Sequence, residues 1–158
     1  MYILSNIDNN NIGGNYMDNN INILDELNKG CSMGIEAIDL ILKKIDNTEF
    51  HDFLVEFSDK YIDLSDEVNE LYKEYSDEEP HEINGMEKLM TWYGIEKDTI
   101  LDDSISKLAD LLINGTNMGI IEGRKILNNK TMDKKIKKIC EKYIDIQEKY
   151  VEKLKNYL

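Results

Sequence analysis

Four long stretches with apolar residues at helical spacing constrain the fold of this 158-residue chain more than any other feature. From about residue 20 onward, apolar side chains recur every three or four residues, which is the spacing of an amphipathic α-helix. The stripes predict helices over about 20–46, from 48 towards Pro80, over about 99–128, and from about 131 to the end of the sequence, with Thr48 as the expected N-cap of the second helix. Helices this long bury their apolar faces by packing on one another, so we expect an all-α fold, with a single four-helix bundle domain over 20–158.

The first 19 residues differ in composition from the rest of the chain. They are rich in Asn and show no sustained helical period, so we expect a disordered N-terminal extension over 1–19 that carries no function. A translation start at Met17 is the alternative interpretation. Gly13-Gly14 lies two codons before this methionine, and Gly-Gly is often encoded by the bases of a bacterial ribosome-binding sequence.

A connector of about 25 residues, 72–98, separates the second predicted helix from the third. Pro80, the only proline, ends the second helix, and 85–93 has the apolar spacing of a short helix. A connector of this length is able to run the height of a bundle, so we expect one crossover between two helical hairpins. The first helix carries a second apolar strip, Met33, Ala37 and Leu40. We expect the connector to cover this strip, and a homodimer surface is the alternative.

The two predicted hairpins resemble each other in sequence. Residues 30–35 (GCSMGI) match 115–120 (GTNMGI), and 60–63 (KYID) match 142–145 (KYID). The first match lies at an offset of 85 residues and the second at 82, as expected if the second hairpin has a turn three residues shorter. These ordered matches predict an internal duplication of one helical hairpin.

Charge and composition exclude several classes of function. The chain has 32 acidic residues against 19 Lys and Arg, a net charge of −13, which disfavours binding to nucleic acid and to anionic membranes. We find no apolar run of the roughly 18 residues that a membrane span needs. Two cysteines are too few for a disulfide framework. We therefore expect a cytoplasmic protein whose partners include neither nucleic acid nor membrane, with a homodimer or an unidentified protein partner left open.

The charges are also distributed unevenly along the chain. Residues 56–82 hold eleven acids and two lysines, whereas 124–138 hold seven bases and one acid. In a bundle with one crossover, the end of the second helix lies beside the turn between the third and fourth. We therefore expect the two blocks to face each other and to favour correct docking of the hairpins.

Two similar antiparallel hairpins with a long crossover resemble the ferritin-like superfamily. The repeated GxxMG blocks and the Met-Glu-Lys…Trp stretch over 86–92 are similar to a group of bacterial ferritin-like proteins with no established activity. The resemblance covers about residues 20–158 and implies an ancestral di-iron site, built from one Glu on each of two helices and Glu-x-x-His on the other two. The only histidines are His51 and His81, and neither lies in such a motif. We therefore expect no metal cofactor, with iron or manganese as the alternative.

Three carboxylates are the weak candidates for a remnant metal or polar site. Glu122 lies at the edge of the apolar stripe of the third helix, and Glu36 and Asp39 flank that of the first. Gln147 falls within the stripe of the fourth helix. A buried carboxylate needs a partner or a raised pKa, so the alternative is a structural ion pair, with Arg124 as the candidate cation.

Two cysteines and two glycines are the remaining candidates for a functional or packing role. Cys31 and Cys140 lie about three turns into parallel helices. We expect free thiols that pack as small apolar groups, with a redox pair or a soft-metal site as the alternative. Gly34 and Gly119 occupy matching places in the repeat. We expect the first and third helices to cross there, and space for a ligand is the alternative.

The function predicted from these residues is that of a non-catalytic module. We find no phosphate-binding glycine loop and no nucleophile spaced to meet a histidine base, so we predict no catalytic residues. A structural, binding or regulatory four-helix bundle without a di-iron centre is the preferred interpretation. A degenerate ferritin-like metal or redox protein, using carboxylates around Glu122, is the alternative.

Overall fold

The computed structural model describes residues 10–81, 89–90, 93–94 and 102–158, with the side chains from residue 17 onward. The described residues form four long helices and no strands, which confirms the all-α four-helix prediction. In chain order the elements are α1 (Asn10–Leu42), α2 (Thr48–Tyr75), α4 (Ile105–Asn129), α5 (Lys134–Leu154) and the short 3₁₀ helix η1 (Lys155–Tyr157). No helix in these parts of the chain is long and apolar enough to cross a membrane.

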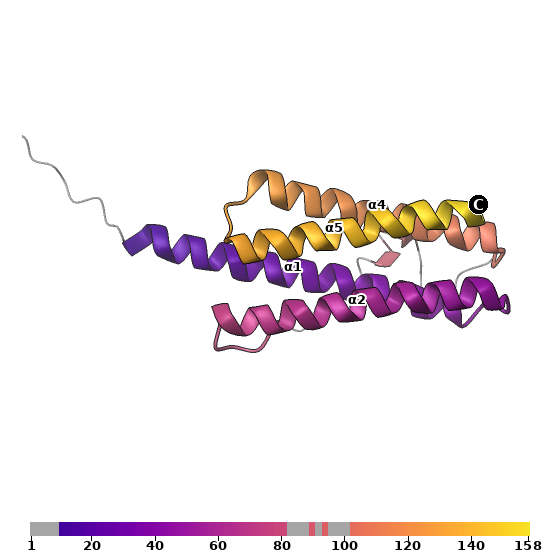
Figure 1. The fold of residues 1–158 in the computed structure, drawn as a ribbon, viewed down its shortest axis with the longest axis horizontal. Coiled ribbons are helices and arrows are strands. Elements are labelled where there is room, and N and C mark those ends of the chain that lie inside the picture. The colour runs from indigo at the N-terminus through magenta and orange to yellow at the C-terminus, as the bar shows by residue number, and fades with distance from the viewer. Residues whose placement is uncertain (1–9, 82–88, 91–92, 95–101) are drawn as a thin grey trace, which may run out of the picture.

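The helices pair into two hairpins that lie on each other as two layers, α1 with α2 and α4 with α5 (Figure 1). The Tyr75 hydroxyl donates to Asp133 Oδ2 at 2.8 Å, so the end of α2 lies beside the start of α5. At the other end, the rings of Phe50 and Tyr157 lie 4.7 Å apart. Helices α2 and α5 therefore run antiparallel, and α4 begins at the opposite end of the bundle from the end of α2 (Figure 1).

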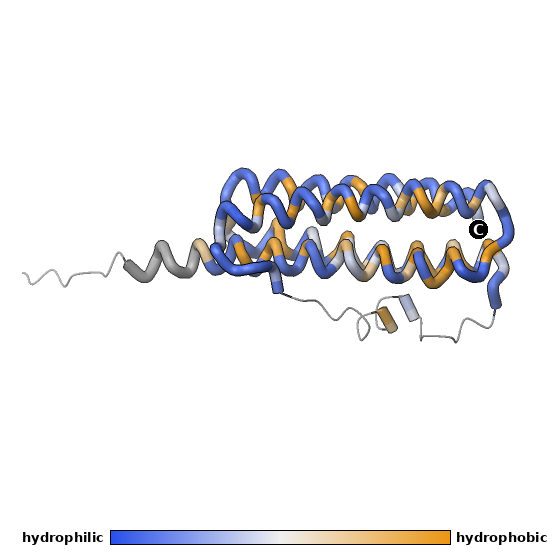
Figure 2. The backbone as a smooth tube through the Cα atoms, turned by 90° about the horizontal axis from the view of Figure 1, so that it is seen from below, coloured by the Kyte–Doolittle hydropathy of each residue, from blue (hydrophilic) through white to orange (hydrophobic). Residues whose placement is uncertain are grey.

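Residues 82–88, 91–92 and 95–98 of the connector, with most of the short helix predicted over 85–93 and the predicted crossover path, lie outside the described residues. Beyond residue 81, the structure describes Leu89, Met90, Tyr93 and Gly94 of this segment. Leu89 and Tyr93 are buried in the same hydrophobic cluster as the four helices. Their short pieces lie beside the bundle in Figure 2.

The second apolar strip of α1 is buried within the chain. Met33 is 1% exposed and Ala37 is fully buried, while Leu40 is half-buried. Met33 and Ala37 belong to the same hydrophobic cluster as the connector residues Leu89 and Tyr93. The observed burial agrees with the expectation that this strip is covered intramolecularly.

Helix α1 is longer at its N-terminus and shorter at its C-terminus than expected. It begins at Asn10, within the stretch for which we expected disorder, and ends at Leu42 rather than near residue 46. Once a helix is nucleated, each added residue gains a backbone hydrogen bond, so a packed helix extends into polar sequence without an apolar stripe. The N-terminal part of α1 projects beyond the other helices in Figure 1.

The other helices also begin at residues that differ from those expected, and a side-chain cap accounts for one of them. The side chain of Asn47, rather than the expected Thr48, accepts the Phe50 backbone N–H at 2.8 Å and caps α2, which satisfies a free N–H group of the first turn. Helix α4 begins at Ile105 after Ser104, several residues later than predicted, and Ser104 makes no side-chain cap hydrogen bond. Helix α5 begins after Asp133 rather than near Thr131, also without a side-chain cap hydrogen bond.

Aromatic side chains hold the two layers together along α2 and α5. The rings of Phe57 and Tyr150 stack with centroids 4.2 Å apart and planes 2° from parallel. Tyr61 stacks on Phe57 at 4.8 Å. Offset or stacked rings at this separation add to the stabilisation that comes from burying their area. The core is therefore continuous from one hairpin to the other.

Candidate functional site

The centre of the bundle is polar but uncharged among the described residues. Tyr61 of α2, Tyr143 of α5 and Tyr93 of the connector are 1–3% exposed, and Gln147 of α5 is 1% exposed. The Tyr61 hydroxyl donates to Gln147 Oε1 at 3.4 Å, and Gln147 Nε2 donates to the Tyr143 carbonyl at 3.1 Å. The hydroxyl of Thr116 on α4 is fully buried beside them. This centre is where a ligand or metal inside the bundle would have to lie.

Helix glycines make room for this centre. A Cβ on Gly34 would overlap the ring of Tyr61, and one on Gly119 would overlap the side-chain oxygen of Gln147. A Cβ on Gly30 would overlap the Tyr143 hydroxyl in the same way. The expected crossing of Gly34 on Gly119 is therefore wrong, because each glycine faces a large side chain instead. The space that the glycines clear is occupied by the protein's own side chains.

The connector contributes to the same centre. A Cβ on Gly115 of α4 would overlap the ring of Tyr93. Burial raises the pKa of Tyr93 to about 12. Burial also raises the pKa values of Tyr61 and Tyr143 well above the usual tyrosine range. All three phenols therefore stay neutral near pH 7.

The sequence placed these tyrosines in or beside the apolar stripes but did not identify them as a cluster. The matched KYID segments carried the signal, since Tyr61 and Tyr143 occupy the same place in each copy. Tyr93 carried no such signal because it belongs to the connector. Its position depends on how the connector packs, which is a tertiary property.

The candidate carboxylates are not brought together in the structure. Glu122 has a side chain 42% exposed and pairs with Lys125 at 2.8 Å, so it makes a structural ion pair at the surface. The predicted cation, Arg124, pairs with Glu148 at 2.9 Å instead. Lys125 lies one helical turn beyond Glu122, so the carboxylate finds its partner at the surface without entering the core.

The two remaining acids also lie apart from Gln147. Asp39 is exposed on α1. Glu36 is half-buried, and one of its carboxylate oxygens is buried without a hydrogen bond from the described residues. Within the described ranges, no three His, Cys, Asp or Glu side chains cluster in a way that would hold a metal ion.

Both cysteines are free and buried. Desolvation raises the pKa of Cys140 to about 11, and it raises the pKa of Cys31 further still. The Cys140 thiol points at the backbone carbonyl of Gly123, with its sulfur 3.7 Å from the oxygen. Because the thiolate is the reactive and metal-binding form, these surroundings fit the expectation that both thiols pack as small apolar groups.

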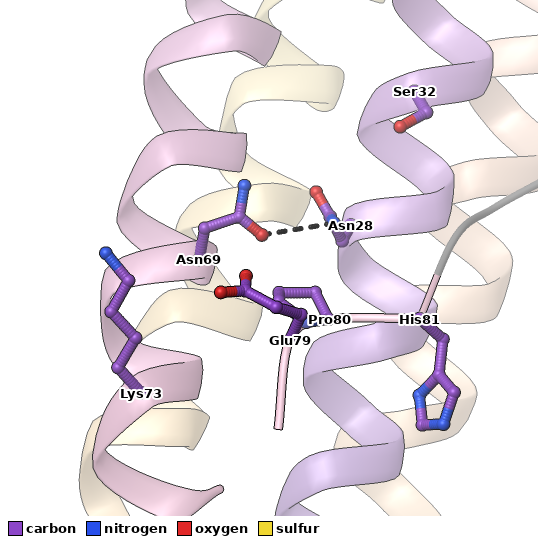
Figure 3. Close-up of a pocket in the computed structure, with 7 residues that line it drawn as sticks. All are labelled: Asn28, Ser32, Asn69, Lys73, Glu79, Pro80 and His81. Carbon is purple, nitrogen blue, oxygen red and sulfur yellow. Dashed lines mark hydrogen bonds between the residues drawn. The ribbon is translucent and has the colours of Figure 1, made fainter. Parts of the chain in front are cut away.

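A polar pocket of about 400 Å³ lies between α1 and α2, where the chain leaves α2 and crosses α1 (Figure 3). Asn28 donates to Asn69 Oδ1 at 3.2 Å and accepts from Ser65 Oγ at 2.6 Å. His81 closes the crossing by a contact of 2.8 Å between its Nδ1 and Asp25 Oδ2. The amides at the floor of this pocket bond to each other, so their main effect is to fix α1 against α2.

The seam between α2 and α5 carries ion pairs between the two hairpins. Lys135 pairs with Glu74 at 2.5 Å and joins the predicted basic and acidic blocks. Lys142, which lies beyond the basic block, pairs with Glu67. These two pairs are seven residues apart on both helices, which is the spacing of charged positions that flank an antiparallel helix seam. Both pairs fit the same alignment of the two hairpins.

A third link closes the seam at its other end. Tyr150 donates to Glu56 Oε1 at 2.6 Å, and Lys153 lies 3.3 Å from the same oxygen. The hydrogen bond from Tyr150, followed by that from Lys153, lowers the pKa of the Glu56 carboxyl. Exposed links of this kind contribute little individually to stability, but their register selects one alignment.

Comparison with known proteins identifies no relative of this chain: no family model, curated protein or solved structure matches it.

Proposed function

We propose that this protein is a non-catalytic four-helix module that acts by binding a partner at its surface. The observation that carries this proposal is the filled centre of the bundle. Three neutral tyrosines and a glutamine occupy it, each buried and several pressed directly onto helix glycines. Because side chains of the described residues fill this centre, we assign recognition to the outer surface of the bundle.

We also propose that the architecture is ferritin-like, without a di-iron centre. Three features support this class: two antiparallel hairpins, a connection between opposite ends of the bundle, and the internal repeat. In each hairpin the matching glycine lies against the matching tyrosine. A Cβ on Gly34 would overlap the ring of Tyr61, and a Cβ on Gly119 would lie 3.0 Å from the hydroxyl oxygen of Tyr143. Duplication of one hairpin accounts for this correspondence. The predicted cytoplasmic location belongs to the same proposal, and cell fractionation tests it.

Metal analysis tests the function directly. The full chain is purified without chelator, incubated with Fe(II), Mn(II) or Zn(II), desalted, and measured by mass spectrometry of the metals. We expect well below one metal per chain and the same melting temperature with and without chelator. Stoichiometric retention of any of these metals would contradict the proposal. The triple variant Glu36→Gln, Asp39→Asn, Glu122→Gln then shows whether the carboxylates expected from the sequence hold the metal.

A further inference from the structure

An open groove follows the seam between α2 and α5. It encloses about 910 Å³ and continues into a smaller hollow of about 360 Å³ along the same two helices. The larger hollow is lined by the apolar side chains of Leu71 and Ile139, and the smaller one by Ile146. All three side chains also pack against the core or belong to it. The groove therefore combines an apolar floor with the length of several helical turns.

Two described residues of the connector pack on the side of the bundle where α1 and α4 lie. Leu89 and Tyr93, four residues apart, are 1% and 3% exposed, and the Tyr93 ring lies on Gly115 of α4. The described connector pieces lie on the side of the bundle away from the α2–α5 seam (Figure 2). The molecule thus shows how its inter-hairpin surface accepts a helical segment, through apolar side chains one turn apart.

Charge determines what kind of segment fits the open side. Seven acids and four lysines line the two hollows, and two of those lysines, Lys135 and Lys142, are already paired across the seam. Asp66 and Asp145 lie exposed on opposite rims. The groove is therefore net acidic, within a chain of net charge −13. Such a field attracts a basic partner and repels nucleic acid or an anionic membrane.

We propose that the α2–α5 groove binds an amphipathic helix with basic flanks from another protein. The apolar face of that helix covers Leu71, Ile139 and Ile146, and its Lys or Arg side chains meet the acidic rims. This inference rests on the proposed function as a binding module and names the chemistry of the partner. Binding weakens as salt rises, because the rim charges are exposed and screened.

A displayed library of 20-residue helical peptides, selected against the immobilised full chain, tests whether the groove binds such a helix. We expect enriched sequences with apolar residues one turn apart and Lys or Arg beside them. The double variant Asp66→Lys, Asp145→Lys should weaken the enriched peptides about tenfold. The matched control Asp39→Lys, Asp103→Lys makes the same charge change at exposed sites away from the groove, and it should change affinity less than about twofold.

Circular dichroism confirms that both double variants keep the fold. Three results would each overturn the proposal that the groove binds a basic helix. These are failure to enrich any peptide, enrichment of peptides without basic flanks, and equal effects of the two double variants. None of these results bears on metal content. A protein that binds no metal but also no basic helix therefore loses this inference alone, whereas stoichiometric metal binding removes the proposed function itself.

Discussion

At the scale of single residues, the fit between helix glycines and buried rings determines how the bundle centre is filled. Gly34 has no side chain, and the ring of Tyr61 occupies the space where one would project. A glycine in the middle of a helix costs about 0.5–1 kcal/mol relative to alanine. That cost is offset because the closely packed ring makes many dispersion contacts with the helix backbone.

Replacing this glycine should therefore destabilise the protein. Overpacking costs about 1–3 kcal/mol, and the gain in helix propensity offsets about 1 kcal/mol of that cost, so we expect Gly34→Ala to lower the free energy of unfolding by up to about 2 kcal/mol. Urea titration followed by circular dichroism measures the change. Asn117→Ala, at an exposed site in α4, is the control and should be neutral or slightly stabilising. An unchanged or raised stability for Gly34→Ala would mean that the ring of Tyr61 moves aside freely.

The two thiols give a second prediction at this scale. Burial raises the pKa of Cys140 to about 11 and that of Cys31 even further, so almost no thiolate forms near pH 8. We expect neither thiol of the folded protein to react with a thiol reagent on the time scale of the unfolded chain. Reaction rates measured with and without denaturant test this. A thiol that reacts as fast in the folded protein as in urea would reopen the redox interpretation.

At the scale of helices, the seam between α2 and α5 shows how charge selects an alignment. Its ion pairs recur at matching spacings on two antiparallel helices, so a shift by one residue would break them all. Reversing one charge, Lys142→Glu, places two acids opposite each other at Glu67. We expect this variant to lower the free energy of unfolding by about 0.2–1 kcal/mol. The swapped pair Glu67→Lys, Lys142→Glu should recover that stability.

Salt gives the control for this prediction. Thermal unfolding of the three proteins is compared at low ionic strength and at about 1 M salt, where the screening length falls to about 3 Å. The difference between Lys142→Glu and the other two proteins should shrink at high salt. A salt-independent difference would point to lost packing by the lysine stem rather than to charge.

At the scale of the whole molecule, the N-terminal part of α1 projects away from the bundle, whereas the core begins near Asn20. This side chain is fully buried and accepts the backbone N–H of Asp133 at 3.0 Å, so it ties α1 to the start of α5. We expect deletion of residues 1–16 to leave the melting temperature unchanged. Deletion of 1–21 removes this link and should lower the free energy of unfolding by about 1–2 kcal/mol.

Each deletion serves as the control for the other. A marked loss of stability on removing 1–16 would show that the projecting residues are part of the folded core. Equal stability of both truncated proteins would show that the bond to Asp133 contributes nothing measurable. Differential scanning calorimetry of the two proteins distinguishes these results.

The sequence by itself determined the four long helices of the described residues and the apolar face of each. These properties repeat along the chain at the helical period, so local spacing is enough to predict them. Helix ends were less predictable. Several polar residues compete for each cap, and Asn47 displaced Thr48 only because its side chain reaches the Phe50 N–H in the folded hairpin.

Only the tertiary structure decided what faces what across the bundle. Gly34 and Gly119 matched each other in the repeat, but they face Tyr61 and Gln147. Glu122 lay at the edge of its stripe, and a small rotation of the helix places it at the surface beside Lys125. A helical wheel fixes the direction of a side chain only relative to its own helix. The rotation and distance of the neighbouring helix follow from the volumes packed between them, and three tyrosines set those volumes here.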